Sequence, residues 1–516
     1  MMHRLLMTIS FGILLMLCFS TLDAQYEVEW ASQRNNKIER NATYKLLGIV
    51  GDRYYAISER NENRLLYTYD LNHNLIEEED WNFFSKNRDY RIQEIITTPS
   101  DTFFYIHELS QQHKEWIIYV CRYRDGKFTD PEEIYFEKYE DVARSRLSDM
   151  FNNYGAYVRK NGGIVMSPDS TKLAFVNVVM PSSHNQDEIV SVVVWDSGLQ
   201  ESWRASYDYN MSNDRFDIKS IKISNDGIVY ALAELEKDLE LDKGIVPLKR
   251  KNLPRTQYVV YRIDRSGIVS NNISIDKKNG IVEAGLFFKD KSSSDFVIAG
   301  FYSDGTKSYR MSGLFWSECS ADLEHTGMKL HAFEKEIWKN MSHDYVIEEG
   351  LFFDNGSTGF VSENYEVRIV NNNNGFNRNA FGVNNFRSFS YYSGELVIPR
   401  FSSTGELIHT FFIQKNYDSP VSASTSYAMA YDGYQYYIMF NDTKRKKQAK
   451  ATGMKGRQFT DMIVLTSSGE ISSDVSLFSE REEDVLFSPY LFCTDNEHIA
   501  FGGFRNGRML VGKIKL

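Results

Sequence analysis

Proline and cysteine are scarce in this 516-residue sequence, which has nine prolines and four cysteines. So few cysteines exclude a disulfide framework, and so little proline excludes a collagen-like chain. After the first 24 residues, no stretch is apolar enough to cross a bilayer as a helix, which needs about 20 such residues. The sequence is therefore not that of a multi-span membrane protein.

Aromatic residues, by contrast, are abundant, with 32 tyrosines and 34 phenylalanines in a chain that is 42% hydrophobic. This composition supplies a large buried core and excludes intrinsic disorder. Tyrosine and phenylalanine are enriched in strands, so the composition favours an all-β fold. The formal net charge is −11.

The first 24 residues resemble a secretory signal peptide. Arg4 precedes an apolar stretch from Leu5 to Phe19, and Ala24 offers a small residue at a cleavage site. We predict a signal peptide at residues 1–24 and one mature domain at residues 25–516. The mature protein would be exported to the periplasm, the outer surface or the medium, with no transmembrane segment after cleavage.

Three cysteines remain after removal of this segment, namely Cys121, Cys319 and Cys493. None lies in a CxxC pair or at a metal-ligand spacing, and at most one disulfide can form. We expect all three to be small buried hydrophobic residues, and we predict no cofactor and no metal site.

A recurring hairpin sets the expected architecture. An apolar residue is followed by a polar turn with Gly or Asn and then by a second apolar run, at residues 69–76, 123–128, 195–199, 263–268, 401–407 and 465–471. Gly and Asn supply the positive φ that tight turns need. Two β-like runs precede each copy, so the repeating unit has about four strands.

Eight such units can be counted from the middle strand of each, near residues 54, 103, 173, 228, 296, 358, 436 and 499. Four-stranded units in fixed order predict an all-β fold, a β-propeller of eight blades, with seven as the alternative. A large β-sandwich would show no such repeat. The last unit ends after its third strand, near Met509–Leu516, so we expect a strand at Tyr26–Trp30 to complete the last blade and close the ring.

One segment carries a resemblance to a known family. Ser167-Pro168-Asp169-Ser170-Thr171-Lys172-Leu173-Ala174-Phe175 resembles the repeat of bacterial Tol-Pal-type WD40-like propellers, with Ser170 in place of the usual Gly. The resemblance implies a propeller fold and a location outside the cytoplasm. It transfers no catalytic residue.

No catalytic motif is present: the sequence has no HExxH, GxSxG, Walker A or GxGxxG pattern. Asp70, Asn72 and Asn74 imitate the start of a calcium loop, but Leu75 stands where such a loop needs Gly, so we expect a hairpin turn. Two short helices are expected near residues 140–151 and 334–341. An enzyme could still assemble its acid and base around the central channel from residues distant in sequence.

Three long loops between second and third strands share a basic charge and one predicted face of the ring. Residues 237–255, 370–387 and 441–458 carry net charges of +3, +2 and +6, which leaves −22 on the rest of the chain. The candidate binding residues are Lys249, Arg250, Lys251, Arg378, Arg387, Lys444, Arg445, Lys446, Lys447, Lys450, Lys455 and Arg457. Such a separation of charge can steer an anionic partner, although loops of this composition are often only solvated insertions.

These observations support two functional hypotheses. The first is an exported, non-enzymatic binding or scaffold propeller of the cell envelope or exterior, a monomer within a larger complex, that docks a protein or anionic glycan through the basic loops. The alternative is a propeller enzyme acting on glycans, a glycosidase or lyase, with its site in the central channel. Nucleic acid is not an expected partner, because the chain is acidic and the basic loops lack aromatic residues for stacking on bases. Two or three inward-facing carboxylates beside an aromatic platform would favour the enzyme.

Overall fold

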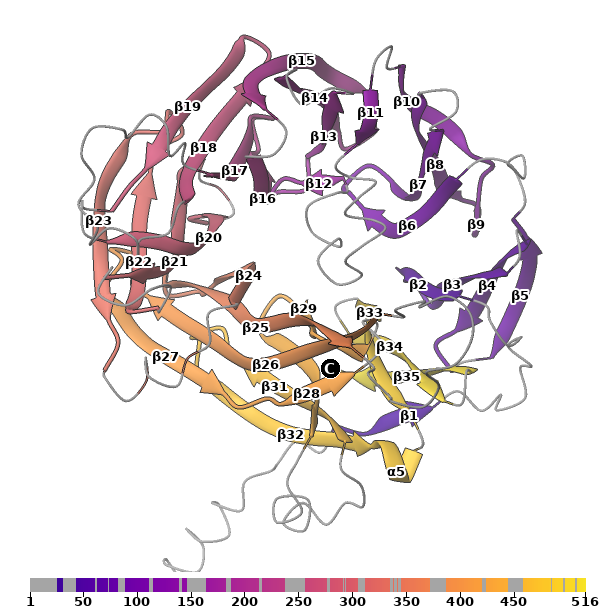
Figure 1. Cartoon of the computed structure of the whole chain (residues 1–516). Helices are drawn as coiled ribbons and strands as arrows, with labels where there is room; N and C mark the ends of the chain where they lie inside the picture. Colours follow the sequence, from indigo (N-terminus) through magenta and orange to yellow (C-terminus); the bar gives the residue numbers. More distant parts are fainter. Residues whose placement is uncertain are drawn as a thin grey trace, which may run out of the picture.

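Eight antiparallel sheets stand in a ring around a common axis in the computed structural model of the chain (Figure 1). The predicted eight-bladed β-propeller is therefore confirmed. The structure describes residues 26–30, 43–60, 63–72, 74–81, 89–110, 115–138, 142–145, 164–181, 187–212, 216–236, 256–275, 279–290, 292, 294–304, 311–334, 337, 341, 345–371, 387–419, 424–443, 458–483, 485–494, 497–505 and 508–516.

The first four blades run in chain order from the innermost to the outermost strand. Blade 1 contains β2 (Thr43–Val50), β3 (Arg53–Arg60), β4 (Asn63–Asp70) and β5 (Leu75–Asp80). Blade 2 contains β6 (Asp89–Thr97), β7 (Thr102–Ser110), β8 (Glu115–Arg124) and β10 (Glu132–Lys138), with β9 (Lys127–Phe128) also on β8. Blade 3 contains β11 (Val142–Ser145) and β12 (Val165–Met166), which both pair with β13 (Lys172–Pro181), then β14 (Asp187–Asp196) and β15 (Glu201–Ser212). Blade 4 contains β16 (Phe216–Ile223), β17 (Val229–Glu236), β18 (Thr256–Asp264) and β19 (Gly267–Ile273).

The remaining blades follow the same order. Blade 5 contains β20 (Gly280–Phe288), β21 (Phe296–Ser303), β22 (Gly313–Cys319) and β23 (His325–Ala332). Blade 6 contains β24 (Tyr345–Phe352), β25 (Thr358–Asn371), β26 (Arg387–Phe401) and β27 (Leu407–Ile413), with β28 (Tyr417–Ser419) on β26. Blade 7 contains β29 (Tyr427–Tyr431), β30 (Tyr436–Thr443), β31 (Gln458–Leu465) and β32 (Ile471–Ser479), followed by α5 (Glu480–Glu483). Blade 8 contains β33 (Leu486–Thr494), β34 (His498–Arg505), β35 (Arg508–Lys515) and β1 (Val28–Trp30).

The N-terminal strand closes the ring, as the sequence predicts. β1 pairs antiparallel with β35, with Val28 opposite Ile514 and Trp30 opposite Gly512. The Trp30 ring lies 5.6 Å from Phe501 in its own blade and 5.1 Å from Phe478 in blade 7. This strand therefore joins the two ends of the chain and also packs against the preceding blade, which removes an open sheet edge.

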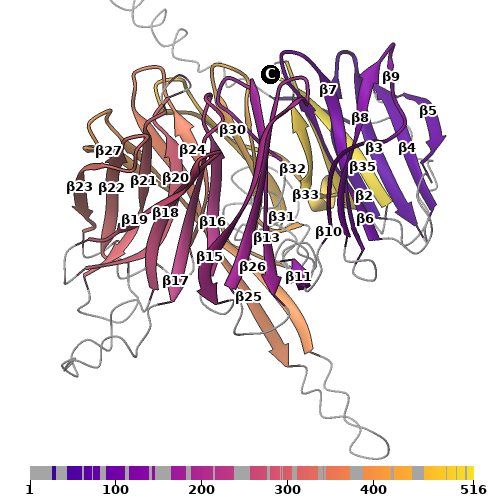
Figure 2. The ribbon, with the colours of Figure 1, turned by 90° about the horizontal axis from the view of Figure 1, so that it is seen from above.

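The core lies between the blades, because each sheet is covered on both faces by its neighbours. The second strand of blade 5, β21, has all eight of its residues buried, which explains why such strands read as continuous apolar runs. Aromatic side chains bridge adjacent blades; for example, Trp116 of β8 and Phe175 of β13 lie 5.7 Å apart between ring centroids. In the view of Figure 2, β25 and β26 extend beyond the other strands of the ring.

In blade 6, the recurring turn that defines the repeat packs against the neighbouring blade 5. Gly405 has φ +82° in the turn between β27 and β26, and a methyl group at this position would overlap the ring of Trp316 in blade 5. The carbonyl oxygen of Gly405 lies 2.9 Å from Nε2 of His331, again in blade 5. Glycine is therefore required here both by the backbone and by the close approach of the turn to the indole.

Ser170 occupies the position where the resembling repeat carries Gly, and its φ is +61°. A non-glycine residue pays for this left-handed conformation, so Ser170→Gly is expected to raise the free energy of unfolding by up to about 1 kcal/mol. Urea unfolding measures the change. Ser403→Gly is the matched control at a turn residue that does not itself have a positive φ, and it should lower stability. An equal response of the two variants would contradict the assignment of strain to Ser170.

Two smaller predictions have different outcomes. The calcium-like segment is a hairpin turn, in which Oδ1 of Asp70 accepts hydrogen bonds from the backbone N–H of Asn72 at 2.9 Å and of Asn74 at 2.8 Å. The helix expected near residues 140–151 is wrong over Val142–Ser145, which form β11 and pair with β13. Strand pairing with the long β13 overrides the weak local helix signal.

Candidate functional site

Six of the innermost strands of the ring share an irregularity in their pairing with the second strand of the blade. The pairing register shifts between Leu46 and Gly48 in β2, Ile92 and Ile95 in β6, Ile218 and Ser220 in β16, Ile281 and Glu283 in β20, Ile347 and Glu349 in β24, and Ser488 and Phe492 in β33. A β-bulge re-aims the side chains beside it. In a radial sheet whose faces are covered by other blades, this change of direction is what can bring side chains into the channel.

Carboxylates occupy equivalent positions at three of these bulges. Glu94, Glu283 and Glu349 each follow an isoleucine by two residues, in blades 2, 5 and 6. Glu94 is exposed and the other two are half-buried. These glutamates place carboxylates on the innermost strands of three blades.

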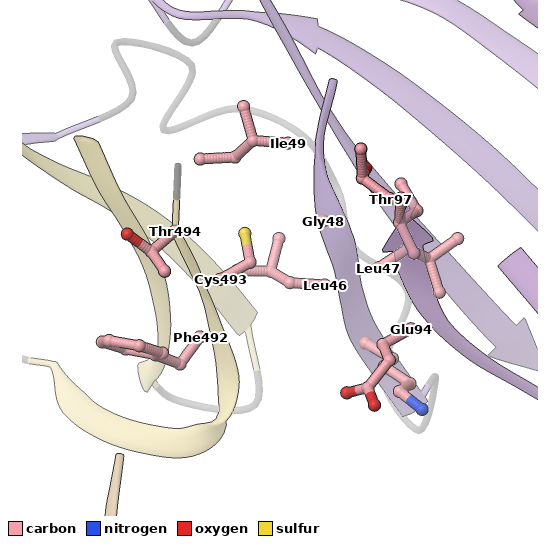
Figure 3. Close-up of a pocket in the computed structure, with 11 residues that line it drawn as sticks. Leu46, Leu47, Gly48, Ile49, Glu94, Thr97, Phe492, Cys493 and Thr494 are labelled. Carbon is pink, nitrogen blue, oxygen red and sulfur yellow. The ribbon is translucent and has the colours of Figure 1, made fainter. Parts of the chain in front are cut away.

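A cavity of about 290 Å³ opens where the bulged strands of blades 8, 1 and 2 meet (Figure 3). Its lining residues come from β2, β6 and β33 and are Lys45, Leu46, Leu47, Gly48, Ile49, Glu94, Ile95, Thr97, Phe492, Cys493 and Thr494. In Figure 3, Phe492, Cys493 and Thr494 lie on one side, and Glu94 and Thr97 lie on the other. The cavity therefore depends on ring closure, because it joins the two ends of the chain.

Among the described lining residues, one cation and one carboxylate supply the charge of this cavity. Nζ of Lys45 donates hydrogen bonds to the carbonyl oxygen of Ile92 at 3.2 Å and to Oε1 of Gln93 at 2.9 Å. Both acceptors belong to the bulge of β6, so Lys45 of blade 1 is tied to the strand segment that carries Glu94. Gly48 allows the close approach, because a Cβ there would lie 2.8 Å from Cβ of Ile95.

His107 lies behind this wall, fully buried in β7 among aromatic rings. Its ring centroid is 5.2 Å from that of Tyr105 and 5.8 Å from that of Trp116. Burial, together with the smaller effect of the nearby ammonium of Lys45, lowers the pKa of His107 to about 3. His107 is therefore neutral at physiological pH and supports the wall of the cavity as a packed aromatic group.

Acid is expected to destabilise the fold through His107. The folded protein keeps this ring neutral, whereas the unfolded chain binds a proton below about pH 6.5, so stability is lost as the pH falls from about 6.5 towards 3. This group alone contributes a slope of about 1.4 kcal/mol per pH unit in that window. Denaturant unfolding of His107→Leu should show a shallower slope than wild type. His409→Leu, at an exposed histidine, should keep the wild-type slope, and equal slopes in all three proteins would contradict the assignment.

The predicted basic surface lies almost entirely outside the described residues. Eleven of its twelve residues are not described, and Arg387 is placed only as the first residue of β26. The strands that flank the three loops do confirm that each loop joins the second and third strands of blades 4, 6 and 7. Residues 1–24, predicted as a signal peptide, also lie outside the described residues. In the part of the chain that the structure describes, no helix is long and apolar enough to span a membrane.

The cysteines show where the sequence prediction is incomplete. Cys121 and Cys319 are buried, as predicted, and burial raises the pKa of both thiols, that of Cys319 to about 12. Cys493 is instead half-buried and lines the cavity. No cluster of three His, Cys, Asp or Glu side chains that could hold a metal is found among the described residues.

Sequence analysis does not single out Lys45, Glu94, Thr97, Phe492 or Thr494. A weak signal for the bulges exists, since neighbouring polar residues interrupt an apolar strand at residues 92–95 and 218–221. The signal says nothing about which blades adjoin a cavity. That information comes only from the closed ring.

No protein-family model and no curated protein matches the chain. Among solved structures, it is similar to an oligogalacturonate lyase in complex with manganese, at 9% identity and a TM-score of 0.33, over 83% of this chain and 96% of the lyase. It is also similar to a post-proline cleaving enzyme from Rickettsia typhi, at 9% identity and a TM-score of 0.38, over 90% of this chain and 58% of the enzyme. A prolyl endopeptidase is similar at 10% identity and a TM-score of 0.33, over 82% of this chain and 54% of the endopeptidase. The chain spans little more than half the length of these peptidases. At such identities the likeness concerns the fold.

These similarities correct the first functional hypothesis. The solved structures reported above are enzymes, in contrast to the predicted non-enzymatic scaffold that docks an anionic partner through basic loops, so that hypothesis is not retained. The first hypothesis used loop charge to choose a candidate surface, and the role of that surface stays a prediction. The described structure instead places a cavity with ionisable side chains on the inner strands.

Proposed function

We propose that this protein is an enzyme that acts on glycans, with its site at the channel cavity formed by β33, β2 and β6. One observation carries the proposal: the bulged inner strands enclose a cavity that holds an exposed carboxylate, that of Glu94. A carboxylate in a concave site can accept or donate a proton during bond cleavage. A lone carboxylate on a convex surface would have no such use.

The other lining groups suit a sugar ring. Thr97 and Thr494 offer hydroxyl groups that both donate and accept hydrogen bonds, as sugar hydroxyls require. Phe492 offers an aromatic surface for the apolar face of a sugar, and the volume is at the lower end of the range for small-molecule sites. The described lining thus supplies an aromatic ring and one carboxylate, where the sequence analysis expected two or three inward-facing carboxylates of a glycan-active propeller.

Export is part of the proposal. A signal peptide at residues 1–24 and the Tol-Pal-type resemblance of residues 167–175 both fit a protein that meets polysaccharides of the envelope or exterior. The propeller would then act as a single catalytic domain.

The test is a screen of the mature protein, residues 25–516, against neutral and anionic polysaccharides, with chain cleavage followed by mass spectrometry of the products. At least one glycan should be shortened. The failure of the folded protein to change any glycan in the panel would contradict the proposal.

Cys493 gives an independent test of the location. It is half-buried in the cavity wall, whereas Cys121 and Cys319 are buried elsewhere, so a thiol reagent should modify Cys493 first. A glycan that is cleaved should slow this modification at saturating concentration. An unchanged labelling rate at saturation would place the binding site elsewhere.

A further inference from the structure

The charges that line the cavity restrict the reaction that it can perform. Hydrolysis of a glycosidic bond ordinarily uses two carboxyl groups, about 5–5.5 Å apart in retaining enzymes and about 6.5–9.5 Å apart in inverting enzymes. Among the described residues that line the cavity, Glu94 alone carries a carboxylate. Glu283 and Glu349 stand at equivalent bulges, but in blades 5 and 6 and not in the cavity wall.

The second ionisable group in the wall is the ammonium of Lys45. Its two hydrogen bonds to Ile92 and Gln93 fix it against the bulge of β6, one residue away from Glu94. An ammonium at this point favours an anionic group on the ligand and disfavours a cationic one. A fixed cation beside a proton acceptor suits a substrate that carries a carboxylate next to the carbon that loses a proton.

We propose that the substrate is an anionic glycan built from uronic acids and that the cavity cleaves it by β-elimination. This inference rests on the proposed function and names its substrate class and reaction. Lys45 binds the uronate carboxylate and, by offsetting its charge, makes the adjacent C5–H more acidic. Glu94 then accepts the C5 proton.

The step balances without a co-reactant. The C5–H bond breaks and its proton goes to Glu94; the C4–C5 double bond forms with that electron pair; the C4–O bond to the neighbouring sugar breaks. The leaving oxygen takes a proton from water, and Glu94 later returns its own proton to water. The products are a shortened chain and an unsaturated uronate at the new non-reducing end.

The test compares a 4-linked polyuronate with the same polymer after reduction of its carboxyl groups to neutral alcohols. The mature protein should produce an unsaturated product, followed by its near-ultraviolet absorbance, from the polyuronate and none from the reduced polymer. Cleavage of either polymer without a double bond, or equal cleavage of both, would overturn the inference and leave the proposed function standing. Cleavage of neither polymer nor any other glycan would overturn both.

Variants of Lys45 test the role of the cation. Lys45→Met should lower kcat/KM on the polyuronate about 10- to 100-fold, the loss expected for a hydrogen bond to a charged group. Lys45→Arg keeps the positive charge and should retain more activity than Lys45→Met. This comparison separates the effect of lost charge from that of a disturbed fold. Lys138→Met, at an exposed lysine on the outer strand β10, is the control and should not change the rate. Wild-type kcat/KM in folded Lys45→Met would overturn the assignment.

Discussion

Glu94→Gln is expected to lower kcat about 100- to 10,000-fold on the glycan that the protein cleaves, while KM changes little. The amide has the size of the carboxylate, so it fills the same part of the cavity wall, but it cannot accept a proton. Glu94 is exposed and lies at a bulge, so the substitution should leave the fold intact. Steady-state kinetics and circular dichroism of the purified variant measure the two effects separately.

The chain offers a matched control at an equivalent position. Glu283→Gln makes the same change at the bulge of β20, whose side chains do not line the cavity. This variant should keep the wild-type kcat. An equal loss in both variants would mean that the carboxylates act together across the channel and that the cavity alone is not the site. No loss in Glu94→Gln would remove the proposed proton acceptor.

Lys415→Met is expected to lower the free energy of unfolding by about 3–5 kcal/mol, because it leaves the charge of Glu363 buried without its partner. Lys415 and Glu363 form an ion pair whose side chains are 0% and 1% exposed. Ser426 completes the site, since its hydroxyl donates to Oε2 of Glu363 at 2.7 Å and its carbonyl oxygen accepts from Nζ of Lys415 at 2.8 Å. Ser393 also donates to Glu363.

This buried pair joins two blades, because Glu363 belongs to β25 of blade 6 and Ser426 directly precedes β29 of blade 7. Denaturant unfolding is measured for Lys415→Met and for the double variant Lys415→Met/Glu363→Leu. The comparison separates the effect of an unpaired buried charge from the effect of changed side-chain packing. The double variant should recover much of the stability, since an apolar pair needs no compensating charge. If the double variant were no more stable than the single one, the loss of stability would come from altered packing and not from the unpaired charge of Glu363.

The fold was largely predictable because its signal is repeated. The blades place apolar strands in the interior, and six of them carry a polar turn with Gly or Asn at the outer hairpin, so the eight middle strands could be counted from the sequence. The strand at Val28–Trp30 was predictable from the missing fourth strand of the last blade. The strand at Val142–Ser145 was not, since its only support is pairing with β13.

The site was not predictable for a physical reason. Glu94 and Phe492 are separated by almost the whole chain and come together only because the ring closes through β1. The bulges that turn inner-strand residues towards the channel leave only a brief break in the apolar pattern. Loop charge is far easier to read from a sequence, and for that reason the first hypothesis was built on the basic loops, most of whose residues lie outside the described part of the chain.

A crystal structure of the Glu94→Gln variant with an oligouronate tests the central claim most directly. The inactive variant should hold the intact oligosaccharide in the cavity between β33, β2 and β6, with a uronate carboxylate on Nζ of Lys45 and the C5 atom facing residue 94. An oligosaccharide bound elsewhere on the propeller, or a cavity that stays empty at saturating ligand, would contradict the account.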